Sequence, residues 1–318
     1  MPEKILVVGH RNPDNDAVCA AVGFAAYCNA VDEKIAQDKG EEFTPQFEAV
    51  VLGPLPPESA WVLERNGFEA PRLVESIAPG AKVALVDHNE YQQSIPGIED
   101  AEIVAVVDHH RMGPMTTPNP ILMLIHPVGS TSTIIAGEFE RAGLEITPEM
   151  AAMMMSSIIT DTVMLRSPTT TQTDKETIEK LAKIAGVDAH EYAMGIFKCR
   201  GGEAKMDIHE LVCADSKEFE VAGKTVLVAQ RETVDLECVM NREDEMRAHM
   251  QSLVKEKGYN FVLLLVTDII AEGSQFLCEG DVTVVEEVFG IKCASGGTWM
   301  PGVLSRKKQV AAPLLSAK

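Results

Sequence analysis

Histidine and aspartate side chains follow three separate apolar runs of the chain. ILVV is followed by GH, VALV by DH and IVAVV by DHH, so His10, Asp87 and His109 each stand just after a strand-like segment. Imidazole and carboxylate groups without a thiolate suit Mn²⁺ rather than a zinc ribbon or an iron–sulfur cluster. The repeated ending therefore predicts a metal site assembled from several parts of the chain.

The first of these endings, GHRNPDND, allows two interpretations. It is either a polar turn that caps a helix or a set of ligands that includes His10, Asp14 and Asp16. The two interpretations are compatible. Asn12 and Pro13 suit an N-cap and a first helical turn, and the two aspartates then remain at the edge of the helix.

Asp161 is a further carboxylate, placed in the otherwise apolar segment SSIITDT. A buried acid needs a partner, and a metal ion supplies one. Two metal ions roughly 3.5–4 Å apart can share a hydroxide and clamp both oxygens of an in-line phosphoryl displacement. The candidate ligands suffice for two metals if one carboxylate bridges them: His10, Asp14, Asp16, Asp87, His109 and Asp161.

Strands and helices alternate in the first two thirds of the chain. The runs ILVV, AVVL, VALV and IVAVV predict strands, and residues 17–29, 57–65, 148–159 and 174–185 predict helices. This alternation predicts an α/β fold in which helices cover a parallel sheet. Because the carboxyl ends of parallel strands share one edge of a sheet, the histidines and aspartates should meet there.

The chain of 318 residues exceeds the usual size of a single core, and its pattern changes at CRGGE, residues 199–203. Paired glycines are poor in helices and strands, which favours a linker. Beyond it, a hairpin with Ala222 and Gly223 near its turn and a helix at 242–257 indicate a smaller α/β domain. We therefore expect two domains, at residues 1–199 and 203–318.

The net charge of −20 argues against a nucleic-acid partner, because an acidic surface repels phosphate backbones. No apolar run reaches the roughly 18 residues of a membrane span. The first residues lack the apolar core of a secretory signal. Seven scattered cysteines without a CxxC pair are typical of reduced thiols, so we expect a cytoplasmic protein.

One compact cationic cluster, SRKKQ, stands out from this acidic background. It is either a solvated basic tail or an anion-binding group. The planar guanidinium of Arg306 suits bidentate phosphate binding, and Lys307 follows it directly.

Five motifs together carry a resemblance to a known family: GHRNPDND, VDHNE, VDHHR, ITDT and SRKKQ. In this order, from Ile5 to Pro313, they resemble the family II inorganic pyrophosphatases of the DHH phosphoesterase superfamily. Other DHH enzymes typically end with a GGGH element, which SGGT at 295–298 does not match. The resemblance implies a metal-binding DHH domain with a parallel sheet, a smaller substrate-binding domain and an active site in the cleft between them.

The resemblance also implies a role for each candidate residue. The first metal would be held by His10, Asp14 and Asp87, and the second by Asp16, Asp87, His109 and Asp161, with Asp87 bridging. His110 would face the scissile oxygen, and Lys217, Arg306 and Lys307 would hold phosphate oxygens. From the residues alone, Lys217 is an ordinary surface lysine, Asp108 is a plausible orienting group, and His88 is left out of the site. GSTST at 129–133 departs from relatives that often have cysteine and alanine there, and we expect no loss of activity from it.

The implied activity is hydrolysis of pyrophosphate to two phosphates by a metal-bridged hydroxide. The implied cofactors are two Mn²⁺ ions per subunit, with Co²⁺ as another option and Mg²⁺ accompanying the substrate, and the implied assembly is a homodimer. One alternative is a DHH-type phosphodiesterase or exopolyphosphatase acting on short nucleotides or polyphosphate. Another is a non-catalytic regulator that binds phosphate or metal.

Overall fold

The structure is a computed structural model that describes residues 4–200, 202–293 and 295–316. The chain divides into two compact units, Met1–Arg200 and Gly201–Lys318. Within the described ranges, no helix is both long enough and apolar enough to cross a membrane.

The first unit contains a parallel sheet, as the sequence predicts, and the sheet has six strands in the order β3-β2-β1-β4-β5-β6. The strands are β1 Ile5–Val8, β2 Phe47–Val51, β3 Arg72–Leu73, β4 Lys82–Val86, β5 Glu102–Asp108 and β6 Leu122–Ile125. β1, β4 and β5 lie next to one another at the centre. They are the three strands whose carboxyl ends carry or are followed by histidine or aspartate, so these residues share one edge of the sheet.

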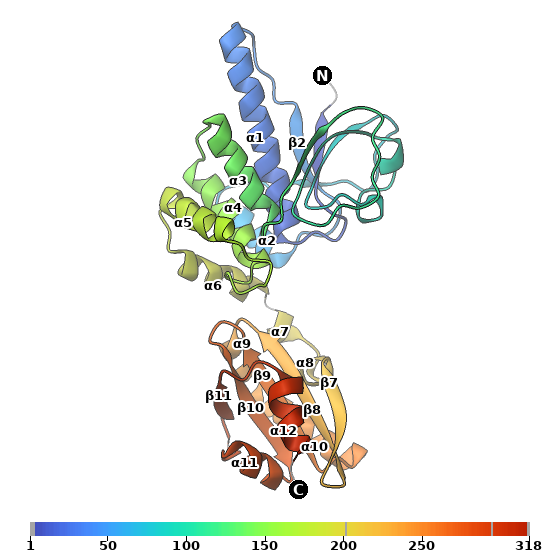
Figure 1. The fold of residues 1–318 in the computed structure, drawn as a ribbon, viewed down its shortest axis with the longest axis vertical. Coiled ribbons are helices and arrows are strands. Elements are labelled where there is room, and N and C mark those ends of the chain that lie inside the picture. The colour runs from blue at the N-terminus through green and yellow to red at the C-terminus, as the bar shows by residue number, and fades with distance from the viewer. Residues whose placement is uncertain (1–3, 201, 294, 317–318) are drawn as a thin grey trace. The chain divides into compact units, whose positions relative to one another are not determined.

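Helices pack beside this sheet, and α1, α3 and α4 contact one another (Figure 1). The helices of the unit are α1 Asn15–Lys39, α2 Pro57–Arg65, α3 Thr131–Ala142, α4 Pro148–Asp161, α5 Gln172–Ala185 and α6 Ala189–Arg200. The 3₁₀ turns η1 Tyr91–Gln93 and η2 Ile98–Asp100 contribute side chains to an apolar cluster on the sheet. In this cluster, Ile95 and Ile98 are buried together with Val8, Val50 and Leu85 of the strands.

The second unit contains a mixed sheet of five strands in the order β11-β10-β9-β8-β7. Its strands are β7 Ser216–Val221, β8 Lys224–Thr233, β9 Phe261–Asp268, β10 Gly273–Gly280 and β11 Thr298–Pro301. β8 and β9 are parallel, and the other pairs are antiparallel. The predicted hairpin is confirmed: Ala222 and Gly223, with φ of 48° and 74°, form the two-residue turn between β7 and β8.

Two apolar clusters cover the two faces of this second sheet. Leu227 and Ala229 of β8 belong to one cluster and Val226 and Val228 to the other, which is the alternation of a strand buried on both faces. The helical elements are α7 Gly202–Lys205, α8 Ile208–Cys213, α9 Leu236–Met240, α10 Glu243–Lys257, α11 Thr283–Phe289, the π-helical turn η3 Arg306–Ala311 and α12 Ala312–Leu315.

Two sequence-based predictions are corrected by the structure. Asp14, not Asn12, is the N-cap of α1, because its carboxylate accepts a hydrogen bond from the Ala17 amide at 2.9 Å. The expected linker at 199–203 is helical over most of its length, since α6 continues to Arg200 and α7 begins at Gly202. Gly201 itself lies outside the described residues.

Candidate metal centre

Short connections place the predicted ligands directly after the central strands. Gly9 follows β1, and a side chain there would lie 2.6 Å from the Ala17 carbonyl, so only glycine permits this close approach of β1 and α1. Asp87 follows β4 with φ of 60°, in the left-handed region that non-glycine residues rarely adopt. Such strained backbone clusters at functional sites.

His10, Asp14 and Asp87 form the first group of ligand-type side chains. Nε2 of His10 lies 3.5 Å from Oδ2 of Asp14 and 3.5 Å from Oδ2 of Asp87. One ligand atom from each of the three residues lies within 4.8 Å of the others. Asp14 therefore caps α1 with one carboxylate oxygen and turns the other toward His10, so capping and ligand geometry coexist.

A second group contains Asp16, Asp87, His109 and Asp161. Nε2 of His109 lies 3.3 Å from Oδ1 of Asp87 and 3.4 Å from Oδ2 of Asp161. Asp87 thus belongs to both groups, with one oxygen facing each histidine. The structure brings together all six residues that the sequence nominates as ligands, drawn from the ends of β1, β4 and β5 and from α1 and α4.

Burial and mutual repulsion shift the ionisation of these acids strongly. Burial, and then the charges of Asp87 and Asp14, raise the pKa of Asp16 to about 7. Burial, and then the charges of Asp16, Asp87 and Asp14, raise the pKa of Asp161 to about 10. Burial also acts to raise the pKa of Asp87, but the nearby imidazoles of His10 and His109 outweigh it and hold that pKa below its usual range.

The pKa values of the two histidines rise as well, but through attraction to the acids rather than through burial. Burial disfavours the charge of His10, but its contacts with Asp14 and Asp87 outweigh burial and raise the pKa to about 10. The pKa of His109 also rises to about 10, since its contacts with the Asp87 and Asp16 carboxylates outweigh burial. In the absence of a metal, protons therefore provide the positive charge that this cluster of acids requires.

His109 provides a direct test of whether a cation fits here. Its Nδ1 lies 3.0 Å from the Val128 carbonyl, so Nδ1 donates, and Nε2 would offer a lone pair to a metal that displaces its proton. Nε2 is buried and has no hydrogen-bond partner among the described residues, although two carboxylates lie within 3.4 Å. A lone pair facing carboxylate oxygens is the donor set of a Mn²⁺-type cation, and the residues fit such a metal.

The start of α3 supports two of the acids, a feature that the sequence analysis missed. The Ser130 hydroxyl donates to Asp16 at 2.8 Å, and the amides of Thr131 and Ser132 donate at 2.6 and 3.3 Å. The Thr131 hydroxyl also donates to Asp87 at 3.0 Å. The available signal was the cluster of hydroxyl residues in GSTST, which is typical of a helix N-terminus.

His110 lies beside the ligands and is oriented by Asp108. Asp108 accepts from the His110 amide at 3.0 Å and pairs with Nδ1 of His110 at 2.9 Å. The bond to Asp108 raises the pKa of His110. Asp108 thus has the contacts of a group that orients His110.

His88 is instead buried with Nδ1 2.9 Å from the Val86 carbonyl, and burial lowers its pKa.

The predicted substrate cations belong to the second unit. The Arg306 side chain is only 17% exposed and lies 2.7 Å from the Asp215 carboxylate. It also donates to the Asp215 carbonyl just before β7 and to the Val228 carbonyl of β8 at 3.5 Å. Lys217 pairs with Val228 across these strands. Arg306 and Lys217 therefore approach the same part of the hairpin, whereas Lys307 is exposed.

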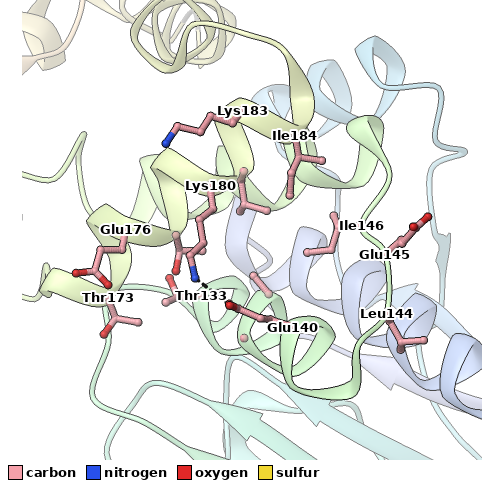
Figure 2. A pocket seen from close by; sticks show the side chains of 14 residues that line it. Thr133, Glu140, Leu144, Glu145, Ile146, Thr173, Glu176, Lys180, Lys183 and Ile184 are labelled. Carbon is pink, nitrogen blue, oxygen red and sulfur yellow. Dashed lines mark hydrogen bonds and ion pairs between the residues drawn. The ribbon is translucent and has the colours of Figure 1, made fainter.

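A groove of about 670 Å³ occupies a different part of the first unit. It is lined by α3, α5 and the segment that follows α3, and in Figure 2 the Lys180 amine points to the Glu140 carboxylate, with a separation of 2.9 Å. None of the six candidate ligands belongs to its described lining.

Comparisons with known proteins cover both units. The family model of the DHH family, N-terminal domain, matches residues 4–158, and the DHHA2 domain matches residues 194–317. The chain is 42% identical, over all of its length and 99% of the relative, to a probable manganese-dependent inorganic pyrophosphatase of Archaeoglobus fulgidus. It is 38% identical to a protein of the same description from Lactobacillus delbrueckii subsp. bulgaricus, with 99% of both chains covered.

Two solved structures resemble the chain over most of its length. A Methanococcus jannaschii protein assigned to the family II inorganic pyrophosphatases superposes with a TM-score of 0.58 at 36% identity, covering 97% of each chain. An exopolyphosphatase-related protein from Bacteroides fragilis reaches a TM-score of 0.52 at 16% identity, over 91% of this chain and 84% of its own, and shows the fold alone.

Proposed function

The chain belongs to the family II, manganese-dependent inorganic pyrophosphatases, and on that premise we propose that it hydrolyses inorganic pyrophosphate to two phosphates. One observation carries the proposal. Two groups of imidazole and carboxylate ligands share Asp87, as a two-metal phosphoryl-transfer centre requires.

The six clustered ligands would hold two cations. His10 and Asp14 would serve one, Asp16, His109 and Asp161 the other, and Asp87 both. Oxygen and nitrogen ligands without sulfur favour Mn²⁺, accept Co²⁺ and leave Mg²⁺ to accompany the substrate phosphates. When bound, the cations would supply a bridging hydroxide at neutral pH and neutralise phosphate oxygens.

His110 would act on the substrate as an acid. Asp108 holds one ring nitrogen of His110, so the other nitrogen is directed away from Asp108. The Asp108 bond raises the pKa of His110, which favours the protonated ring. We propose that His110 donates this proton to the leaving phosphate.

Lys217, Arg306 and Lys307 would bind the phosphate oxygens. Pyrophosphate carries about four negative charges when fully ionised, and hydrogen bonds to charged groups contribute roughly 1.5–3 kcal/mol each. Arg306 is paired with Asp215, so phosphate would compete with that carboxylate for the guanidinium. Because the ligands and the cations belong to different units, substrate would draw the two together during turnover and exclude water.

The partners follow from the same chemistry. A net charge of −20 favours a small metal-complexed anion over a nucleic acid. We further propose a cytoplasmic enzyme that forms a homodimer through the first unit. Light scattering coupled to size exclusion, applied to the full chain and to the first unit alone, tests the dimer.

The substrate is tested by phosphate release from pyrophosphate, tripolyphosphate and a dinucleotide in parallel with Mn²⁺. We expect pyrophosphate to be strongly preferred, chelation to abolish its hydrolysis, and Mn²⁺ to restore activity better than Mg²⁺ alone. Preference for the dinucleotide or for tripolyphosphate would replace the proposal with a phosphodiesterase or an exopolyphosphatase.

The cationic residues are tested by replacing Arg306 and Lys307 together with alanine. Substrate binding and turnover should fall while manganese content is unchanged, because no proposed metal ligand is altered. Lys308→Ala, an adjacent exposed cation, is the matched control and should retain activity. Unchanged kinetics in the double variant would leave SRKKQ without a role in substrate binding.

A further inference from the structure

A third group of ligand-type side chains lies in the second unit. His209 and Cys213 belong to α8, and His249 belongs to α10. One ligand atom of each residue lies within 4.8 Å of the others. None of the three is used by the proposed hydrolysis, and this group differs from the others by containing a thiol in place of carboxylates.

The two histidines face each other through ring nitrogens. Nδ1 of His209 lies 3.1 Å from Nε2 of His249, and the ring planes are almost perpendicular, at 86°. Two such nitrogens need either a shared proton or a cation between them. Two nitrogens bound to one zinc ion at 2.0–2.1 Å in tetrahedral geometry are about 3.3 Å apart, close to the observed separation.

The helices that carry these residues are packed against each other before any metal binds. Leu211 of α8 and Met246 and Met250 of α10 are buried in one apolar cluster. His209 and Cys213 are four residues apart, so both lie on one face of α8. His209 is exposed, whereas Cys213 and His249 are half-buried, which leaves the group accessible from solvent.

Charged groups surround the three side chains. Burial, and then the neighbouring His209, lower the pKa of His249. Asp207 and Glu256 act in the opposite direction on the same ring, and they add negative charge around the group. Burial raises the pKa of Cys213, so a bound metal would have to displace its proton.

We propose that His209, Cys213 and His249 form a binding site for one transition-metal ion of the zinc class. Two imidazoles and one thiolate would supply three ligands, and water would complete a tetrahedral set. The thiolate selects Zn²⁺ or Co²⁺ over Mn²⁺, which prefers oxygen ligands. The two kinds of site in this chain thus differ in the metal that they prefer.

The bound metal would fix the corner between α8 and β7. The Ser216 hydroxyl donates to the Cys213 carbonyl at 2.9 Å, so the ligand Cys213 is tied to the first residue of β7. Linking α8 to α10 through a metal would therefore restrict the connection that leads into this edge strand.

Cobalt spectroscopy on the full chain, first saturated with Mn²⁺, tests the proposal. We expect one equivalent of Co²⁺ to produce a thiolate-to-cobalt charge-transfer band, which the sulfur-free ligands around Asp87 cannot produce even if Co²⁺ exchanges into them. Cys213→Ser should abolish the band, and His249→Gln should weaken Co²⁺ binding at least tenfold. Cys293→Ser, a half-buried thiol of the same unit outside the group, is the matched control and should retain the band.

Two results would overturn the site. One is the absence of a band at saturating Co²⁺ in the folded, Mn²⁺-loaded protein. The other is a band that persists in Cys213→Ser. Thermal unfolding of each variant without metal verifies the fold. His209→Gln, which changes an exposed side chain, replaces any variant that does not fold and should also weaken Co²⁺ binding at least tenfold.

Discussion

Asp87 places its carboxylate between two histidines from a backbone in the left-handed region. Its Oδ2 faces His10, and its Oδ1 faces His109 and accepts from Thr131. The side chain is 1% exposed, so no solvent competes for these oxygens. Every proposed two-metal arrangement therefore depends on this residue.

Asp87→Asn should weaken the binding of both metals. Asparagine tolerates positive φ, so the backbone is retained while one anionic oxygen becomes an amide that cannot bridge two cations. We expect Mn²⁺ affinity to fall at least tenfold at both sites, measured by metal content after equilibrium dialysis. Asp38→Asn, an exposed acid near the end of α1, should bind normally. Loss of only one metal would contradict the bridging role.

His110→Gln should separate catalysis from metal binding. The residue is proposed to act on the substrate, so metal content should stay near normal while kcat falls by roughly 10²–10⁴-fold, the usual contribution of a general acid. Metal analysis and steady-state kinetics on one preparation check this. A variant that loses a metal would show that His109 and His110 have exchanged roles in our assignment.

At the scale of elements, the start of α3 joins the candidate ligands to α5. Ser130 and Thr131 bond Asp16 and Asp87, and the neighbouring Gly129 amide and Thr133 hydroxyl donate to Asp174 at 2.9 and 2.7 Å. Asp174 is fully buried and also completes the capping box of α5 with Thr171. The Asp174 carboxylate therefore fixes the start of α3, which donates hydrogen bonds to Asp16 and Asp87.

Asp174→Asn should destabilise the fold and weaken metal binding together. In asparagine, an amide NH₂ replaces one carboxylate oxygen and faces the Gly129 amide or the Thr133 hydroxyl, which are themselves donors. We therefore expect a loss of about 2–3 kcal/mol in the free energy of unfolding. Urea denaturation and Mn²⁺ titration measure the two effects. Asp188→Asn, an exposed acid that bonds the Glu191 amide near the start of α6, should cost less than about 1 kcal/mol and leave metal binding unchanged.

At the scale of the whole molecule, the chain consists of two units with separate apolar cores and a net charge of −20. In the first unit, α6 packs back through Tyr192, whose ring lies 5.6 Å from that of Trp61. Four groups around Asp87 have pKa values above their usual range, so metal-free folding is coupled to proton binding.

Metal-free protein should lose stability as the pH rises from 6 to 9. His10, His109 and Asp161 have pKa values of about 10 in the folded chain, well above their unfolded values near 6.5 and 3.9. The folded state therefore binds more protons than the unfolded state throughout this range, and stability falls with rising pH. Thermal unfolding of chelator-treated protein measures this loss. Saturating Mn²⁺, which replaces the protons, should flatten the profile or reverse its slope, and parallel profiles would contradict the coupling.

A truncated chain ending at Arg200 should fold and bind Mn²⁺ but hydrolyse almost no pyrophosphate. All six candidate ligands and α6 are retained, whereas Lys217, Arg306 and Lys307 are removed. Circular dichroism, metal content and phosphate release check the three parts. Hydrolysis near that of the full chain would show that the second unit is unnecessary.

The sequence by itself determined the parallel sheet, the endings of its strands and the six candidate ligands. These features are readable because β-branched runs and turn residues are local signals, and because parallel strands bring their carboxyl ends to one edge. Lys217 was nominated only through family resemblance, since a lysine on an exposed strand has no local feature that distinguishes it.

Only the tertiary structure decided which oxygen of Asp87 faces which histidine, and that the start of α3 holds Asp16. The contact between His209 and His249 was likewise outside the reach of local patterns. Hydrogen bonds and ligand contacts join atoms that are far apart in the chain, and the bond from the Thr131 amide to Asp16 spans 115 residues. Their geometry is set by packing between elements, which residue types and spacing do not specify.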